Sequence, residues 1–350
     1  MDRSPYILGC LLGTAVGDAA GLRREGLSRR RAERMYGRAP IRPELAFGKG
    51  FCSDDTEHTQ MVGYALAASS GDPTEFERQF AKQLKRWLLT VPIGVGFATL
   101  RACIKLTLGV SPRRSGVFSA GNGPAMRSAL LGVCAKSDEH LKQLVHASTR
   151  LTHTDPRAEE GALLVARAAR QLVSGQDIAP VRFLTASAQN LAGEELRTRV
   201  AAASSALASG MTCTEFADSQ NWSTGVTGYV NHTVPAALYC WATSPHDLRC
   251  CVENSVRLGG DSDSVAAIAG AICGANLGAD AVPADWLHTL SEWPRSTDWM
   301  GELTAALSAS TPSGPSPAPP PMRWSATLPR NLVVGTIVVG IALRRMCPPY

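Results

Sequence analysis

Aromatic residues are scarce in this sequence: Phe, Trp and Tyr together make up 6% of the 350 residues. Alanine fills much of the apolar content instead, which favours closely packed helices. Convincing alternation of apolar and polar residues is missing, and the best candidate for a strand, residues 225–230, is short. Long basic runs are missing too, and the net charge of +5 is mild, so we expect no nucleic-acid binding.

The ten cysteines lack the spacing of a metal or redox site. No two of them are separated by two residues, and Cys250 and Cys251 are adjacent. A chain of this length buries a sizeable core without disulfides, and a disulfide framework would be denser and more regular. We therefore expect free, mostly buried thiols and a cytoplasmic protein.

Apolar residues recur at helical spacing along most of the chain. The pattern predicts helices over 7–16, 61–66, 76–88, 158–173, 196–207, 234–241 and 264–277. The first of these resembles the apolar core of a signal peptide. Asp18 follows it closely, however, and Arg23 and Arg24 stand where a cleavage site would be, so we expect no targeting segment there. The prediction is an all-α fold with one domain over 1–310.

The composition changes at Thr311, where six of the next twelve residues are proline. This predicts an extended linker over 311–327 and a short apolar helix in the C-terminal segment 328–350. The twelve apolar residues 332–343 would span about 18 Å as a helix, against roughly 30 Å of hydrocarbon. That length favours packing on the globule or a partner over membrane contact. Deletion of residues 311–350 should then spare the chemistry.

Two clusters of hydroxyl and carboxylate side chains each precede a predicted helix. The first contains Ser53, Asp54 and Asp55; the second follows two glycines and contains Asp261, Asp263 and Ser264. Either cluster alone is explained by helix capping. Adjacent carboxylates repel each other unless a cation lies between them, and such oxygen ligands suit Mg²⁺ or Mn²⁺. Their similar make-up favours two halves of one split metal site.

Three further signals are weaker. Glu25 falls at the end of the first helix, where an acid is most often a solvated charge. The loop Gly121-Asn122-Gly123 is either a plain turn or a set of backbone N–H groups that bind a phosphate. His153 precedes a helix and is more typical of a local hydrogen-bonding residue than of a catalyst.

Taken together and in this order, six segments resemble the ADP-ribosylglycohydrolase family: LLGTAVGDAAGLRRE, SDDTEHTQ, GNGPAMR, THTDPRAEEGALLVA, GYVNHTVPAALY and GGDSDSVAAIAGAICGA. The resemblance covers roughly residues 5–290, and the combination is specific although each string alone is not. It implies a single, orthogonally packed all-α domain that holds two divalent ions, Mg²⁺ or Mn²⁺.

The resemblance also implies roles for single residues. Metal-ligand positions fall on Ser53, Asp54, Asp55, Asp261, Asp263 and Ser264. Threonine is common in the family at the last of these, and the hydroxyl of Ser264 can still coordinate. The candidate catalytic carboxylates are Glu25, Asp54 and Asp263, and which of them acts as the base is open. The segments that line the ADP-ribose cleft correspond to Gly121, Asn122, Gly123 and His153.

The implied reaction is hydrolysis of the N- or O-glycosidic bond between ADP-ribose and an acceptor. The partner would be an ADP-ribosylated protein or a small ADP-ribose conjugate. Two alternatives stay open. One is a non-catalytic ADP-ribose-binding protein on the same fold. The other is a different two-metal hydrolase, such as a phosphoesterase, for which His58 would have to face the site.

Overall fold

The computed structural model describes residues 2–37, 40–309 and 317–347. These residues form nineteen α-helices, three 3₁₀ helices and no strand, so the predicted all-α fold is confirmed. The α-helices are α1 (Ser4–Gly21), α2 (Arg29–Tyr36), α3 (Asp54–Ala68), α4 (Pro73–Leu88), α5 (Phe97–Thr107), α6 (Pro112–Ser115), α7 (Gly123–Met126), α8 (Ala129–Cys134), α9 (Asp138–Arg150), α10 (Pro156–Arg170), α11 (Pro180–Asn190), α12 (Glu194–Ala208), α13 (Cys213–Ser219), α14 (Val230–Thr243), α15 (Leu248–Arg257), α16 (Ser262–Leu277), α17 (Ala284–Thr289), α18 (Thr297–Ser308) and α19 (Trp324–Arg345). The 3₁₀ helices are η1 (Leu22–Arg24), η2 (Leu172–Ser174) and η3 (Ala279–Ala281).

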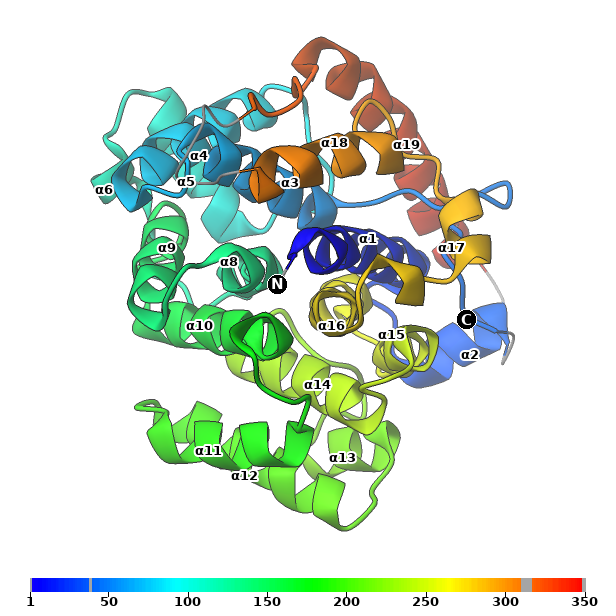
Figure 1. Cartoon of the computed structure of the whole chain (residues 1–350). Coiled ribbons are helices and arrows are strands. Elements are labelled where there is room, and N and C mark those ends of the chain that lie inside the picture. The colour runs from blue at the N-terminus through cyan, green and yellow to red at the C-terminus, as the bar shows by residue number, and fades with distance from the viewer. Residues whose placement is uncertain (1, 38–39, 310–316, 348–350) are drawn as a thin grey trace.

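Helices α1 and α16 lie side by side at the centre of the molecule (Figure 1). Their backbones touch because α1 carries glycine at every fourth position, namely Gly9, Gly13, Gly17 and Gly21. Residues four apart share one face of a helix. A Cβ added to any of these glycines would lie 2.2 to 2.4 Å from a backbone atom of α16. At Gly21 that atom belongs to Asp263, so the contact extends into the second acidic cluster.

The other helices surround this central pair. Helices α3, α8 and α18 pack against α1, while α10, α14 and α15 pack against α16. Helices α11 and α12 form an outer layer beyond α14 (Figure 1). Each helix that the apolar periodicity predicts is present. The strand candidate 225–230 contributes only isolated backbone bridges, one of them between Val226 and Gly260.

The C-terminal helix α19 differs from the prediction. It has 22 residues instead of twelve and begins at Trp324, within the stretch predicted as a linker over 311–327. Residues 311–316 of that stretch lie outside the described residues. The early turns of α19 were missed because Thr327, Arg330 and Asn331 are polar, although all three are buried. The expected helix length of about 18 Å was therefore wrong: α19 is long and apolar enough to cross a membrane by length and composition, as is the mostly buried helix α1.

One side of α19 packs on the globule. Val334 is buried in a small apolar cluster with Leu22 and Leu45, and Ile337 and Ile341 pack against this cluster. The remaining surface of α19 exposes several large apolar side chains: Leu332, Val333, Val339 and Leu343. The packed side agrees with the expectation of a segment docked on the globule, and membrane contact by the exposed surface stays the untested alternative.

The glycine contact between α1 and α16 can be tested with a matched pair of substitutions. Alanine favours a helix over glycine by about 1 kcal/mol, but in Gly13→Ala the new Cβ meets the carbonyl oxygen of Gly270 at 2.2 Å. Overpacking of this kind costs about 1–3 kcal/mol. We expect urea denaturation to show a lower free energy of unfolding for Gly13→Ala. Gly301→Ala, in α18 with open space around it, should be neutral or stabilising. A Gly13→Ala protein as stable as Gly301→Ala would refute the contact.

Candidate functional site

Asp18, near the end of α1, fixes the start of α3. Its buried carboxylate accepts hydrogen bonds from the backbone N–H of Ser53 at 2.9 and 3.0 Å. It also accepts from the N–H and the hydroxyl of Thr56 at 3.1 and 2.6 Å. Ser53 is the N-cap of α3, with Asp54 and Asp55 in the first turn. Asp18 was not predicted as a site residue, and its signal in the sequence is its position between the closely packed Gly17 and Gly21.

A tight turn directs the second cluster toward the first. Gly259 and Gly260 have positive φ angles of 69° and 76°, which glycine adopts without strain. A Cβ on Gly260 would lie 2.0 Å from the carbonyl oxygen of Val226. Helix α16 then begins with Asp261 as its N-cap. The side-chain amide of Asn122 donates to the Asp261 carboxylate at 2.6 Å and so fixes its orientation.

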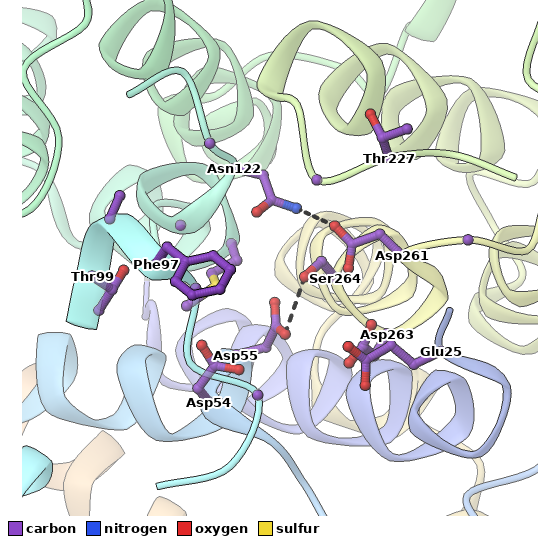
Figure 2. A pocket seen from close by; sticks show the side chains of 18 of the residues that line it. Glu25, Asp54, Asp55, Phe97, Thr99, Asn122, Thr227, Asp261, Asp263 and Ser264 are labelled. Carbon is purple, nitrogen blue, oxygen red and sulfur yellow. Dashed lines mark hydrogen bonds between the residues drawn. The ribbon is translucent and has the colours of Figure 1, made fainter. Parts of the chain in front are cut away.

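The structure brings the two clusters together in one cleft (Figure 2). The carboxylate of Asp55 accepts hydrogen bonds from the hydroxyl groups of Ser53 and Ser264, each at 3.2 Å. Carboxylate oxygens of Asp18, Asp55 and Asp263 lie within 4.8 Å of one another. Residues more than 200 positions apart in the sequence thus share one acidic site.

The crowding of these acids raises their pKa values. Burial disfavours the charged form and neighbouring carboxylates add repulsion, so the pKa values of Asp54, Asp55 and Asp263 lie well above the usual range. Asp55 and Asp263 each retain a buried Oδ1 that has no hydrogen-bond partner. Unpaired buried oxygens among like charges are the ligands that a hard divalent cation requires. Asp18 differs, because its oxygens already accept four hydrogen bonds.

Glu25 follows η1 and lies beside Asp263 at the edge of the cleft (Figure 2). Its pKa is raised to about 7, chiefly by burial and also by the charges of Asp261 and Asp18, while Arg345 lowers it. A carboxyl group that titrates near neutral pH is suited to proton transfer. Of the acids that line the cleft, Glu25 is therefore a good candidate for moving a proton in the reaction.

The Gly121-Asn122-Gly123 loop packs against His153. A Cβ on Gly121 or Gly123 would lie 3.1 or 3.0 Å from the imidazole ring, so the glycines allow this close contact. The loop differs from a ready-made anion site, because the N–H groups of Gly121 and Asn122 already donate to the Ser119 hydroxyl and the Gly228 carbonyl. His153 is buried, which lowers its pKa to about 3, and it is therefore neutral at physiological pH.

The cleft enclosed by these groups has a volume of about 590 Å³. The lining residues that were not predicted include Phe97, Thr99, Ser119 and Thr227. Phe97 is 86% exposed and lines the cleft (Figure 2). No motif marks these four residues in the sequence. Phe97 and Thr99 lie in the first turn of α5, Ser119 and Thr227 lie in loops, and all four are common residue types.

His58 does not face the acidic site. Its Nδ1 lies 2.9 Å from a guanidinium nitrogen of Arg127, and its ring packs edge-on against Trp87. It is absent from the described residues that line the cleft. The arrangement therefore does not favour a two-metal hydrolase with a histidine ligand.

The chain is similar to proteins of one known family. The family model described as ADP-ribosylglycohydrolase matches residues 2–315. The chain is 34% identical to an uncharacterized protein of Archaeoglobus fulgidus, over 85% of this chain and 94% of that one. It is 28% identical to the ADP-ribosyl-[dinitrogen reductase] glycohydrolase of Rhodospirillum rubrum, over 81% of this chain and 89% of that one.

More distant relatives agree with these matches. The chain is 27% identical to the ADP-ribosylhydrolase ARH3 of Bos taurus, over 79% of this chain and 86% of that one. Among solved structures, an ADP-ribosylglycohydrolase-related protein complex matches with a TM-score of 0.66 and 26% identity. That match covers 88% of this chain and 97% of the other.

The raised pKa values predict how the metal-free protein responds to pH. An acid whose pKa is raised by folding binds protons more tightly in the folded state, so stability is lost as pH rises. The loss should run from the ordinary carboxyl range near 4 through the values of about 6 for Asp18 and about 7 for Glu25. The buried His58 and His153 act in the opposite direction, because their pKa values are lowered, so the unmodified protein is compared with Glu25→Gln, in which both histidines are unchanged. We expect Glu25→Gln to raise the Tm in chelator more at pH 8 than at pH 5.5, and Mg²⁺ to raise the Tm of the unmodified protein more at pH 8. An effect of Glu25→Gln on Tm that is equal at the two pH values would contradict the electrostatic description of the site.

Proposed function

Because this chain belongs to the ADP-ribosylglycohydrolase family and is thus a glycosidic-bond hydrolase, we propose that it releases ADP-ribose from an acceptor with the help of two divalent cations, Mg²⁺ or Mn²⁺. The observation that carries this proposal is the convergence of buried carboxylates with unpaired oxygens on one cleft.

Six residues would hold the cations. They are Ser53, Asp54 and Asp55 at the start of α3, and Asp261, Asp263 and Ser264 at the start of α16. When bound, such ions supply positive charge that orients ribose hydroxyl groups and lowers the pKa of a water molecule. Asp18 would not bind a cation itself but would hold the start of α3 in place, through its hydrogen bonds to the N–H groups of Ser53 and Thr56.

Glu25 would accept a proton from the attacking water. The pKa of its carboxyl group is about 7. Glu25 lies beside the second cluster but is not one of the three acids, Asp18, Asp55 and Asp263, whose oxygens lie within 4.8 Å of one another. The bond that breaks joins C1″ of the distal ribose to a nitrogen or oxygen of the acceptor, through an oxocarbenium-like state. The acceptor leaves with the bonding electron pair as the oxygen of water adds to C1″, and one proton of this water passes to Glu25. The acceptor takes up a proton from solvent, and Glu25 then releases its proton to solvent.

The rest of the cleft would bind the ADP-ribose moiety. Gly121, Asn122, Gly123 and His153 line the cleft, with Asn122 across from Glu25 (Figure 2), and the neutral imidazole of His153 suits a hydrogen bond better than an ion pair. The substrate would be an ADP-ribosylated protein or a small ADP-ribose conjugate, in line with the names of the relatives. We also propose a cytoplasmic location, which the ten free cysteines support.

The direct test is release of free ADP-ribose from arginine-linked and serine-linked ADP-ribosylated protein, with Mg²⁺, with Mn²⁺ and with chelator. We expect metal-dependent release from at least one substrate. Asp263→Asn should lower the rate by a factor of about 100 or more, because it removes a ligand charge, and should leave the fold intact. The matched control Asp280→Asn, at an exposed site, should be indistinguishable from the unmodified protein.

Two outcomes would contradict the proposal. Full activity in chelator would exclude the role of the cations. Full activity of Asp263→Asn with Mg²⁺ or Mn²⁺ would exclude the assignment of the second cluster.

A further inference from the structure

Helix α19 lies beyond residue 315, where the family match ends, yet it contacts both loops that carry the site. We propose that α19 is a positioning element for the catalytic carboxylates, in which Arg345 holds the loop of Glu25 and Arg330 holds the loop that leads to Ser53. This inference rests on the proposed function, because it takes these loops to be catalytic. It also reverses the expectation that residues 311–350 are dispensable for activity.

Arg345 binds the Glu25 loop at two points. Its guanidinium donates to the carbonyl oxygen of Arg23 at 2.6 Å and to that of Glu25 at 2.8 Å. One planar group therefore fixes both sides of the turn. The next residue, Gly26, donates its N–H to the carbonyl of Gly260 at 2.7 Å. The Glu25 loop is thus held between α19 and the turn that starts α16.

Arg330 fixes the entry to α3. It is 1% exposed, and one of its nitrogens donates to the carbonyl oxygen of Cys52 and to the carboxylate of Glu292, both at 2.6 Å. The same oxygen of Glu292 accepts from the N–H of Cys52 at 2.6 Å. The backbone on both sides of Cys52 is therefore bound, and the next residue is Ser53, the N-cap of α3.

Packing alone does not account for Arg330. An arginine is costly to bury, and an apolar side chain serves packing better, as Val334 does on the same helix. Arg345 is half-buried, and its two hydrogen bonds to the Glu25 loop distinguish it from the other residues at this end of the helix. Positions 330 and 345 are fifteen residues apart in one helix, which corresponds to about 22 Å along its axis. Each of the two binds a different site loop, so a single rigid element sets the placement of one loop relative to the other. Asn331 anchors the helix separately, through hydrogen bonds to Thr90 at 3.1 Å.

The test for Arg345 uses the full-length chain and steady-state kinetics. Arg345→Ala should lower kcat about tenfold or more, because small displacements of a catalytic group have effects of this size, while KM changes by less than about twofold. The kcat of Arg345→Lys should lie between those of the unmodified protein and Arg345→Ala, because lysine can donate to one carbonyl but lacks the bidentate geometry of arginine. Arg344→Ala is the matched control: it removes the neighbouring guanidinium, which donates to the Cys347 carbonyl, and should keep full kcat.

A packing variant separates positioning from stability. Val334→Ala should lower Tm and leave kcat per folded molecule unchanged. The proposal for Arg345 is overturned if Arg345→Ala retains the unmodified kcat, or if it loses activity only in proportion to folded protein, as Val334→Ala would.

The test for Arg330 does not depend on activity. Arg330→Lys keeps the buried positive charge but cannot make both hydrogen bonds of the guanidinium, to the Cys52 carbonyl and to Glu292. We therefore expect calorimetry to show that this variant binds Mn²⁺ about tenfold more weakly. The affinity of the control Arg344→Ala for Mn²⁺ should equal that of the unmodified protein. An affinity equal to that of the unmodified protein would overturn the role of Arg330. If the unmodified chain binds Mn²⁺ but releases no ADP-ribose, the proposed function fails, while the calorimetric comparison still decides whether Arg330 positions the loop.

Discussion

The close approach of α1 and α16 is the constraint on which the rest of the site depends. Gly17 and Gly21 let the backbone of α1 touch that of α16 at Ala266 and Asp263. The same contact places the carboxylate of Asp18 within reach of both acidic clusters. Asp18 in turn receives the N–H groups that start α3. A larger side chain at either glycine would therefore separate the helices and also the two halves of the site.

The electrostatics of the site favour a bound cation. Folding buries several carboxylates side by side, and their pKa values rise because burial disfavours the charged form and neighbouring carboxylates repel it. Glu57, the next acid along α3, shows the contrast. It pairs with the buried guanidinium of Arg295 at 2.6 Å and accepts a hydrogen bond from the indole of Trp87 at 2.7 Å. The protein thus provides partners for the acid that faces away from the cleft and leaves oxygens of Asp55 and Asp263 unpaired.

Apolar periodicity predicted seven of the helices, among them the central α1 and α16 and the helix α3 that follows the first cluster, and residue types were sufficient to mark both acidic clusters as candidates for one site. Three features were beyond such patterns. The role of Asp18 depends on hydrogen bonds to a segment 35 residues away. The contact of Arg345 with Glu25 joins residues 320 positions apart. The buried residues in the first turns of α19 are polar, as Arg330 is, and a search for apolar periodicity cannot detect them. Short-range signals predict elements, whereas the long-range hydrogen bonds that orient a site require the folded chain.

The central claim is that the two clusters together hold divalent cations. Anomalous diffraction at the manganese absorption edge, from crystals grown with Mn²⁺, tests it most directly. The account predicts two strong peaks in the cleft, bounded by the carboxylates of Asp54 and Asp55 on one side and Asp261 and Asp263 on the other. An empty cleft in crystals of protein that releases ADP-ribose, or manganese bound only at other positions, would contradict it.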